Sequence, residues 1–146
     1  MFDLNNYTSD PIVFSGHTSN IKKSLLTSDA KYVISISDDK TLRQWDVQSA
    51  SEIKNIKFES TPNSIEISRD GELLILAQGK LVELYNASNL EKINTFTIPT
   101  PVSSASIHPN KSVFVCGCED FTLYKYSIPN GVELGNIFYI IFLLFH

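Results

Sequence analysis

The sequence has one tryptophan, six glycines and no dense run of positive charge. Its densest basic cluster, Lys22-Lys23, is too small to predict tight binding to a nucleic-acid backbone. The glycines are scattered and form no Gly-x-Gly-x-x-Gly series, so a loop that cradles phosphate is excluded. The first residues lack the charged and apolar regions of a signal peptide. We therefore expect a reduced, intracellular protein without a cofactor.

Cysteine is equally scarce, and its two copies, Cys116 and Cys118, fall in one predicted strand. Their spacing places both side chains on one face, in a geometry unsuited to a disulfide. With His108 they would still lack a fourth metal ligand, and the sequence has no Cys-x-x-Cys motif or histidine pair. We interpret both as buried strand residues, because free cysteine behaves as a small hydrophobe, and we expect no metal site.

What the chain does contain is a repeat. Gly16-His17 opens and Trp45-Asp46 closes a unit of roughly 40 residues, which resembles a blade of the WD-repeat family. Aromatic residues that close short strands recur at intervals of about 41 residues, at Phe2, Trp45, Tyr85 and Tyr126. No helical periodicity is present, and each unit has four short runs of strand character. The 146 residues, of which 42% are apolar, suffice for one compact domain.

The repeat predicts an all-β WD-repeat β-propeller that is incomplete, with about three four-stranded blades plus part of a preceding one. Propellers close with four to eight blades, so we interpret the chain as a piece of a propeller. The predicted divisions are the end of a preceding blade with its outer strand at Thr8–Ser15 (1–15), a complete WD blade (16–60), two degenerate blades (61–99 and 100–134), and an apolar tail (135–146).

The tail has nine consecutive apolar residues without alternation. That is too short for a membrane span, which needs about 20 residues. A buried strand is one interpretation. We favour another, in which the reading frame leaves the gene near Leu134.

The first blade carries the residues of the WD-repeat hydrogen-bond tetrad: His17, Ser35 or Ser37, Asp39 and Trp45. An indole N–H, a hydroxyl and an imidazole can form a chain to a carboxylate in the turn between the second and third strands. The same residue types could form a hydrolase triad, but there is no Gly-x-Ser-x-Gly elbow. We predict a structural tetrad and no catalytic residue.

The second and third blades lack most of the tetrad, and we expect them to depend on packing. Tyr124 and Tyr126 could stack on RNA bases, but without a basic groove we interpret them as core or edge residues. No contact motif assigns partner-binding residues. We expect partner contacts from loops that reach the propeller faces, at Thr18–Asn20, Asp38–Lys40 and Glu119–Phe121.

Three segments resemble one family more specifically, that of the serine/threonine kinase receptor-associated proteins, also called Unr-interacting proteins. They are Ser15–Lys23, Ser103–Pro109 and, with Gly131–Leu134, the segment Glu119–Tyr126. The resemblance implies a seven-bladed, non-catalytic adaptor of the survival-of-motor-neuron complex, which loads Sm proteins onto spliceosomal RNAs, and a link to receptor serine/threonine kinases in animals.

From this resemblance we expect protein partners in ribonucleoprotein assembly, only indirect contact with RNA, no membrane and no small-molecule substrate. We also expect cytoplasmic and nuclear localisation and a role in mRNA splicing. The alternative is the WD-repeat subunit of eukaryotic translation initiation factor 3, a relative of that family.

Overall fold

The computed structural model describes residues 11–138. This part of the chain has strands and no helix, and so no helix long and apolar enough to cross a membrane. The strands are β1 (Ile21–Leu26), β2 (Tyr32–Ser37), β3 (Thr41–Asp46), β4 (Glu52–Lys57), β5 (Pro62–Ile67), β6 (Leu73–Gln78), β7 (Leu81–Asn86), β8 (Lys92–Thr97), β9 (Val102–Ile107), β10 (Val113–Cys118), β11 (Thr122–Ser127) and β12 (Glu133–Phe138).

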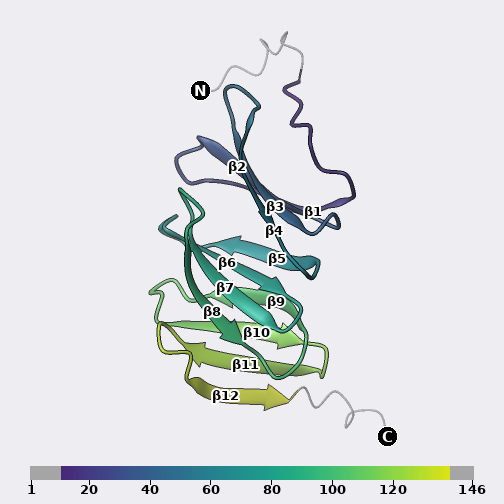
Figure 1. The fold of residues 1–146 in the computed structure, drawn as a ribbon. Helices are drawn as coiled ribbons and strands as arrows, with labels where there is room; N and C mark the ends of the chain where they lie inside the picture. Colours follow the sequence, from purple (N-terminus) through teal and green to yellow (C-terminus); the bar gives the residue numbers. More distant parts are fainter. Residues whose placement is uncertain (1–10, 139–146) are drawn as a thin grey trace, which may run out of the picture.

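The strands form three antiparallel sheets, each a meander of four strands that are consecutive in sequence. The first sheet is β1–β4, the second β5–β8 and the third β9–β12. In Figure 1 the sheets follow one another from top to bottom and pack face to face. This arrangement confirms the predicted fold class of four-stranded propeller blades.

Two boundaries differ from the sequence prediction. An outer strand was predicted at Thr8–Ser15, but residues 11–17 form no strand, because no strand in the described part lies beside them to accept their backbone hydrogen bonds. The boundary predicted between residues 134 and 135 falls inside β12, whose backbone pairs with β11 as far as Phe138. The start of the predicted preceding blade (1–10) and the end of the apolar tail (139–146) lie outside the described residues.

Every hairpin in the described part has a turn residue with positive φ. The three blades have three turns each, and at each of the three turn positions only one blade uses glycine for that residue. A left-handed residue lets a short loop match the twist of its two strands. The turns between first and second strands use Ala30, Gly71 and Lys111, those between second and third strands use Lys40, Gly79 and Phe121, and those between third and fourth strands use Ala50, Leu90 and Gly131.

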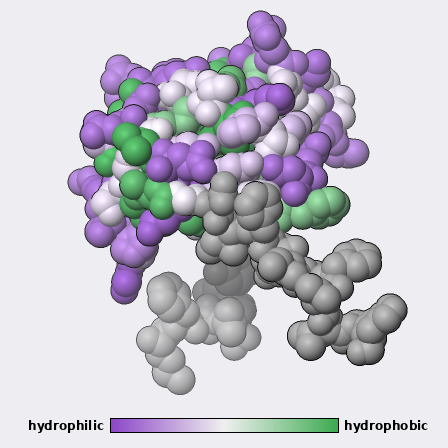
Figure 2. Space-filling model, turned by 90° about the horizontal axis from the view of Figure 1, so that it is seen from below, coloured by the Kyte–Doolittle hydropathy of each residue, from purple (hydrophilic) through white to green (hydrophobic). Residues whose placement is uncertain are grey.

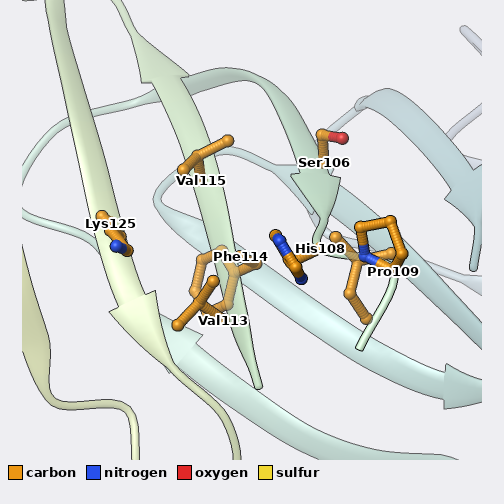
Figure 3. A pocket seen from close by; sticks show the side chains of 8 residues that line it. Ser106, His108, Pro109, Val113, Phe114, Val115 and Lys125 are labelled. Carbon is orange, nitrogen blue, oxygen red and sulfur yellow. The ribbon is translucent and has the colours of Figure 1, made fainter. Parts of the chain in front are cut away.

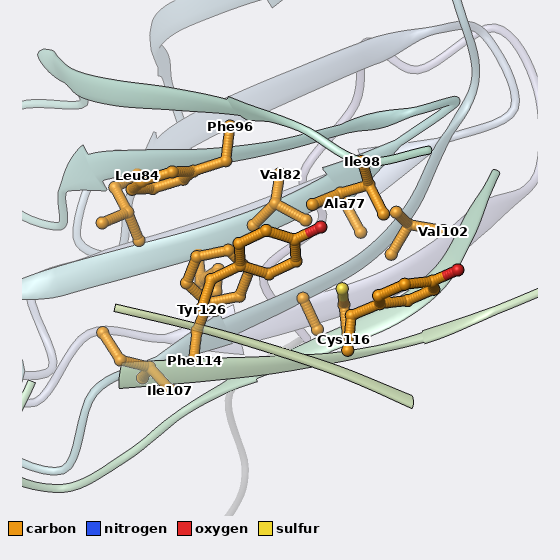
Figure 4. Packing of buried hydrophobic residues seen from close by; sticks show 13 residues of the cluster. Ala77, Val82, Leu84, Phe96, Ile98, Val102, Ile107, Phe114, Cys116 and Tyr126 are labelled. Carbon is orange, nitrogen blue, oxygen red and sulfur yellow. The ribbon is translucent and has the colours of Figure 1, made fainter. Parts of the chain in front are cut away.

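The hydrophobic core lies between neighbouring sheets. Alternation along β6 sends Leu74 and Leu76 toward the first sheet and Ile75 and Ala77 toward the third. Figure 4 shows the interface between the second and third sheets, where Phe114 of β10 packs against Phe96 of β8, with ring centroids 4.9 Å apart. β6 is therefore apolar on both faces, as expected for a sheet with a sheet on either side.

Polar side chains also join the sheets. The Gln44 amide of β3 donates a 2.8 Å hydrogen bond to the Ser88 carbonyl in the second sheet, and the Asn94 amide of β8 donates an equal one to Pro129 in the third. Seen from below, the surface is mainly polar, with apolar residues in small separate groups (Figure 2). The Gln44 and Asn94 bonds each tie a strand of one blade to the turn between the third and fourth strands of the next, one at each interface.

Candidate functional site

The four side chains of the predicted tetrad lie in one hydrogen-bonded chain at the edge of the first sheet. The Trp45 indole N–H donates to Ser35 Oγ at 2.9 Å, and Ser35 Oγ lies 2.7 Å from His17 Nε2. His17 Nδ1 lies 2.9 Å from Asp39 Oδ2. Because the carboxylate can only accept, Nδ1 carries a proton, and in the neutral imidazole Nε2 then accepts the Ser35 proton.

Of the two serines that the sequence left open, the structure places Ser35 in this chain. Ser37 lies nearby in β2, where its hydroxyl donates to the Ser19 carbonyl and accepts the Asp39 N–H. It therefore fixes the entry to the turn instead of linking the tryptophan to the histidine. Every buried side-chain nitrogen and oxygen in the described residues has a hydrogen-bond partner.

Asp39 is the most heavily bonded member. Its Oδ1 accepts from the N–H and the hydroxyl of Thr41, at 3.0 and 2.6 Å, and its Oδ2 accepts from the Thr18 N–H at 3.0 Å. Burial alone would raise the pKa of this carboxyl. The hydrogen bonds from Thr41 and His17 outweigh burial and hold the pKa of Asp39 well below its ordinary value.

The geometry argues against a nucleophilic role for this serine. Ser35 is only 3% exposed, and its hydroxyl is held between the Trp45 N–H and His17 Nε2. A catalytic serine requires an accessible hydroxyl facing an oxyanion hole. The arrangement instead ties the segment before β1 to the turn between β2 and β3.

The second blade has a polar network of its own that the sequence analysis missed. Glu83 of β7 is 2% exposed, and one of its carboxylate oxygens accepts from the Tyr85 hydroxyl at 2.7 Å and from the Gln78 amide at 3.2 Å. The other oxygen pairs with the ammonium of Lys92 at 2.5 Å. Burial, and then the Glu83 carboxylate, raise the pKa of Tyr85, which keeps its hydroxyl a donor. Our expectation that this blade depends on packing was therefore incomplete.

The third blade has a different polar network. The Tyr124 hydroxyl donates to Asp120 Oδ2 at 2.8 Å, and Asp120 Oδ1 accepts the Thr122 N–H at 3.1 Å. The residue two positions before the closing aromatic thus enters the network in every described blade. Arg43 occupies that position in the first blade, 3.6 Å from Asp39, and Glu83 in the second. Alternation puts this residue on the same face as the aromatic, which is the signal that could have found it.

The loops that were predicted to contact partners lie along one rim of the stack. The Asp38 N–H donates to the Asn20 carbonyl, so Thr18–Asn20 and Asp38–Lys40 are neighbours. The turn Glu119–Phe121 sits at the corresponding place in the third blade, where the Glu119 N–H donates to Pro101 in the loop that enters β9. Backbone bonds from Phe58 to Lys40 and from Val102 to Gly79 continue the rim between them. Its chemistry is mixed, with exposed acids, lysines and one aromatic ring.

The third sheet has a shallow depression of about 410 Å³ on its outward face. Figure 3 shows Val115 of β10 and Lys125 of β11 beside it, with His108 and Pro109 from the turn before β10. Its lining offers no convergent set of polar groups. Within residues 11–138 no three His, Cys, Asp or Glu side chains converge in a way that could hold a metal ion.

The two cysteines are free thiols in β10. Burial raises the pKa of Cys116 to about 12, and burial likewise raises the pKa of Cys118. A thiol with a raised pKa forms little of the reactive thiolate at neutral pH. Cys116 packs in the core between the second and third sheets, among Val102 and Phe114.

Stacked four-stranded blades with a Trp–Ser–His–Asp chain define a β-propeller repeat protein. The chain belongs to the WD-repeat family: the sequence model for the WD domain, G-beta repeat, matches residues 10–46 and 90–127. Proteins of this family are in general interaction platforms without catalytic activity.

Within the family, the chain is similar to the serine-threonine kinase receptor-associated protein of Mus musculus. The two are 42% identical over 136 residues, which is 93% of this chain and 39% of that protein. Eukaryotic translation initiation factor 3 subunit I of Aspergillus terreus is 30% identical over 91 residues, 60% of this chain and 27% of that one. The chain thus spans less than half the length of the curated relatives it matches.

A solved structure of the RRP9 WD40 repeats shares the fold. It matches with a TM-score of 0.78 at 21% identity, covering 87% of this chain and 41% of that one. At this identity the likeness concerns the fold alone, and it agrees with the blade assignment.

Proposed function

We propose that this chain forms part of a WD-repeat scaffold in ribonucleoprotein assembly, as an adaptor of the survival-of-motor-neuron complex that loads Sm proteins onto spliceosomal RNAs. The observation that carries the proposal is the 42% identity to a serine-threonine kinase receptor-associated protein across 93% of this chain. The name of that relative also supports a link to receptor serine/threonine kinases in animals. Partners would be proteins, with RNA reached through them, in the cytoplasm and the nucleus.

The mechanism is rigid display. Bonds such as those of Asp39 and Asp120 to the strands below fix the rim turns before any partner arrives. Fixed loops lose little conformational freedom on binding, which leaves more of the contact energy for affinity. Blade faces joined by Phe114 and its neighbours keep neighbouring rims in register.

The test is affinity purification of the tagged, full-length protein from its own cells, followed by quantitative mass spectrometry. We expect enrichment of survival-of-motor-neuron complex subunits and Sm proteins over a tagged, unrelated WD-repeat protein. The alternative is supported by the 30% identity to initiation factor 3 subunit I, and it predicts enrichment of initiation factor subunits and small ribosomal proteins. That second pattern would overturn the proposal.

A further inference from the structure

Phe121, in the turn between β10 and β11, occupies an unfavourable position. It has a φ of 63°, in the left-handed region where a bulky side chain is strained. The corresponding residue in the second blade is Gly79, which takes this conformation without strain. Phe121 is also 81% exposed, so its ring gains nothing from burial within the described part of the chain.

Two other large residues with positive φ have contacts that offset their backbone strain. Leu90 is bulky but 2% exposed, so packing between the sheets offsets its conformation. Lys111 is half-buried, and its ammonium pairs with Asp70 and Glu72. Among the six non-glycine residues with positive φ in residues 11–138, Phe121 alone is bulky, apolar and exposed.

The exposure of Phe121 is not simply a consequence of its place on the last described sheet. Lys40 holds the equivalent turn position in the first sheet, where the second sheet packs on the following face, and it is exposed as well. A following blade can therefore leave the side chain at this position exposed, as at Lys40, although the Val102 N–H of the third sheet reaches the backbone carbonyl of the half-buried Gly79. Phe121 belongs to neither of the two core clusters between the sheets.

The turn that presents the ring is rigid. Asp120 accepts the Thr122 N–H and the Tyr124 hydroxyl, and the Phe121 N–H donates to the Cys118 carbonyl. Glu119, two residues before the ring, is exposed; its backbone N–H donates to Pro101, and its carboxylate has no hydrogen bond or ion pair within residues 11–138. A fixed, exposed aromatic beside a free carboxylate matches the anchor residues that dominate protein interfaces.

We propose that Phe121 and Glu119 form a docking surface for a protein partner that has an apolar pocket bordered by a lysine or arginine. The pocket receives the Phe121 ring, and the cation pairs with the Glu119 carboxylate. This inference rests on the proposed scaffold function and names the surface that it uses. Backbone strain is common at binding sites, where it lowers stability but serves function.

The test replaces Phe121, in the full-length protein in its own cells, by the photocrosslinking amino acid p-benzoylphenylalanine. We expect crosslinks to a partner protein at apolar residues flanked by lysine or arginine, and none from the same substitution at Ile93, an exposed residue of β8. Crosslinks only to lipid or to a second copy of this chain, or equal yields from both positions, would overturn the proposal.

Affinity for the purified crosslinked partner gives the second measurement. Phe121→Asn and Phe121→Gly both suit the left-handed turn, and we expect each to weaken binding about tenfold or more. We expect their melting temperatures to equal or exceed that of the wild type, so misfolding cannot explain the loss. Glu119→Gln should weaken binding a few-fold, on the order of a rim charge. Unchanged affinity in the Phe121 variants would overturn the proposal.

The two proposals fail separately. If ribonucleoprotein-assembly proteins co-purify with Phe121→Asn as well as with the wild type, the docking surface is wrong and the scaffold function stands. If the crosslinked partner belongs to another process and needs Phe121, the surface stands and the proposed process is wrong.

Discussion

At the scale of single residues, Ser35 is the centre of the first blade's polar chain. It receives the Trp45 N–H and supplies a proton to His17, so it satisfies two buried groups at once. Ser37, on the same face of β2, bonds only to nearby backbone. Removing Ser35 or His17 should therefore lower the stability of the fold by a measurable amount.

We expect Ser35→Ala to lower the free energy of unfolding by about 1–3 kcal/mol, because two buried polar groups lose their partner. His17→Ala should lower it by a similar amount, since Ser35 and Asp39 each lose one of their hydrogen-bond partners. Urea unfolding measures both. Ser103→Ala, at an exposed position, is the control and should leave stability within about 0.5 kcal/mol. An unchanged melting temperature in His17→Ala would contradict the structural role of the chain.

Asp39 makes a prediction about acid stability. Because the fold lowers its pKa, the ionised carboxylate contributes stability that is fully present above the ordinary pKa of about 3.9 and is lost as pH falls below it. We expect Asp39→Asn to be less stable than the wild type at pH 7, by about 1–3 kcal/mol. The difference should shrink as pH falls below about 4.

Unfolding titrations between pH 7 and pH 3 would follow this convergence. Asp38→Asn, at an exposed neighbour whose nearest cation is Lys22 at 3.5 Å, is the matched control and should change stability by less than about 0.5 kcal/mol at every pH. Parallel curves for Asp39→Asn and the wild type would show that the Asp39 carboxylate is not coupled to folding.

At the scale of elements, each described third strand brings a different residue to the same place. Arg43 contacts the turn aspartate in the first blade, Glu83 gathers three donors in the second, and Tyr124 caps Asp120 in the third. The blade motif therefore requires a satisfied network at this edge, and not one fixed set of residues.

The second-blade network can be tested by a double-mutant cycle. Lys92→Met leaves the Glu83 carboxylate buried with only neutral donors, and we expect it to cost about 2–4 kcal/mol. Adding Glu83→Gln removes the buried charge and should restore most of that loss, with a coupling energy of about 1–3 kcal/mol. Thermal and urea unfolding of the four proteins supply the cycle. Additive effects would mean that the two side chains do not interact.

Much of each element could be predicted from the sequence. The Gly16-His17 and Trp45-Asp46 pairs mark the first blade, and the four short runs of strand character in each unit correspond to the four strands of each sheet. The choice between Ser35 and Ser37 could not be made, because both lie on one face and only the path of the segment before β1 decides which serine meets His17.

Other features could not be predicted from the sequence, because their sequence signals are weak. Glu83 looks like a solvated charge in a strand, and nothing local shows that Lys92 and Tyr85 converge on it. The left-handed turn at Phe121 has no glycine to mark it. The last strand, β12, departs from apolar alternation, and its extent depends on backbone pairing with β11.

At the scale of the molecule, the interfaces between sheets carry the hydrophobic core. Phe114 is fully buried between Phe96 of the second sheet and Tyr126 of its own sheet. We expect Phe114→Ala to cost about 3–5 kcal/mol. Its neighbour Val115 faces outward and is 42% exposed, so Val115→Ala should cost less than about 1 kcal/mol. Equal losses, measured by chemical unfolding, would contradict the face assignment of β10.

The same architecture explains why a scaffold suits this fold. Blades are held together by apolar faces and by bonds such as Gln44 to Ser88, while the rim turns remain available to partners. Polar networks fix those turns in place beneath the surface that they present. The stack is thus built to hold several short loops in a constant spatial relation.

The central claim, a scaffold for loading Sm proteins, is tested most directly by measuring Sm-core assembly on a spliceosomal RNA in cell extract depleted of this protein. We predict that depletion lowers the assembly rate and that the purified wild-type protein restores it, while translation initiation in the same extract is unchanged. Unchanged Sm-core assembly together with reduced translation initiation would contradict the account and favour the initiation-factor alternative.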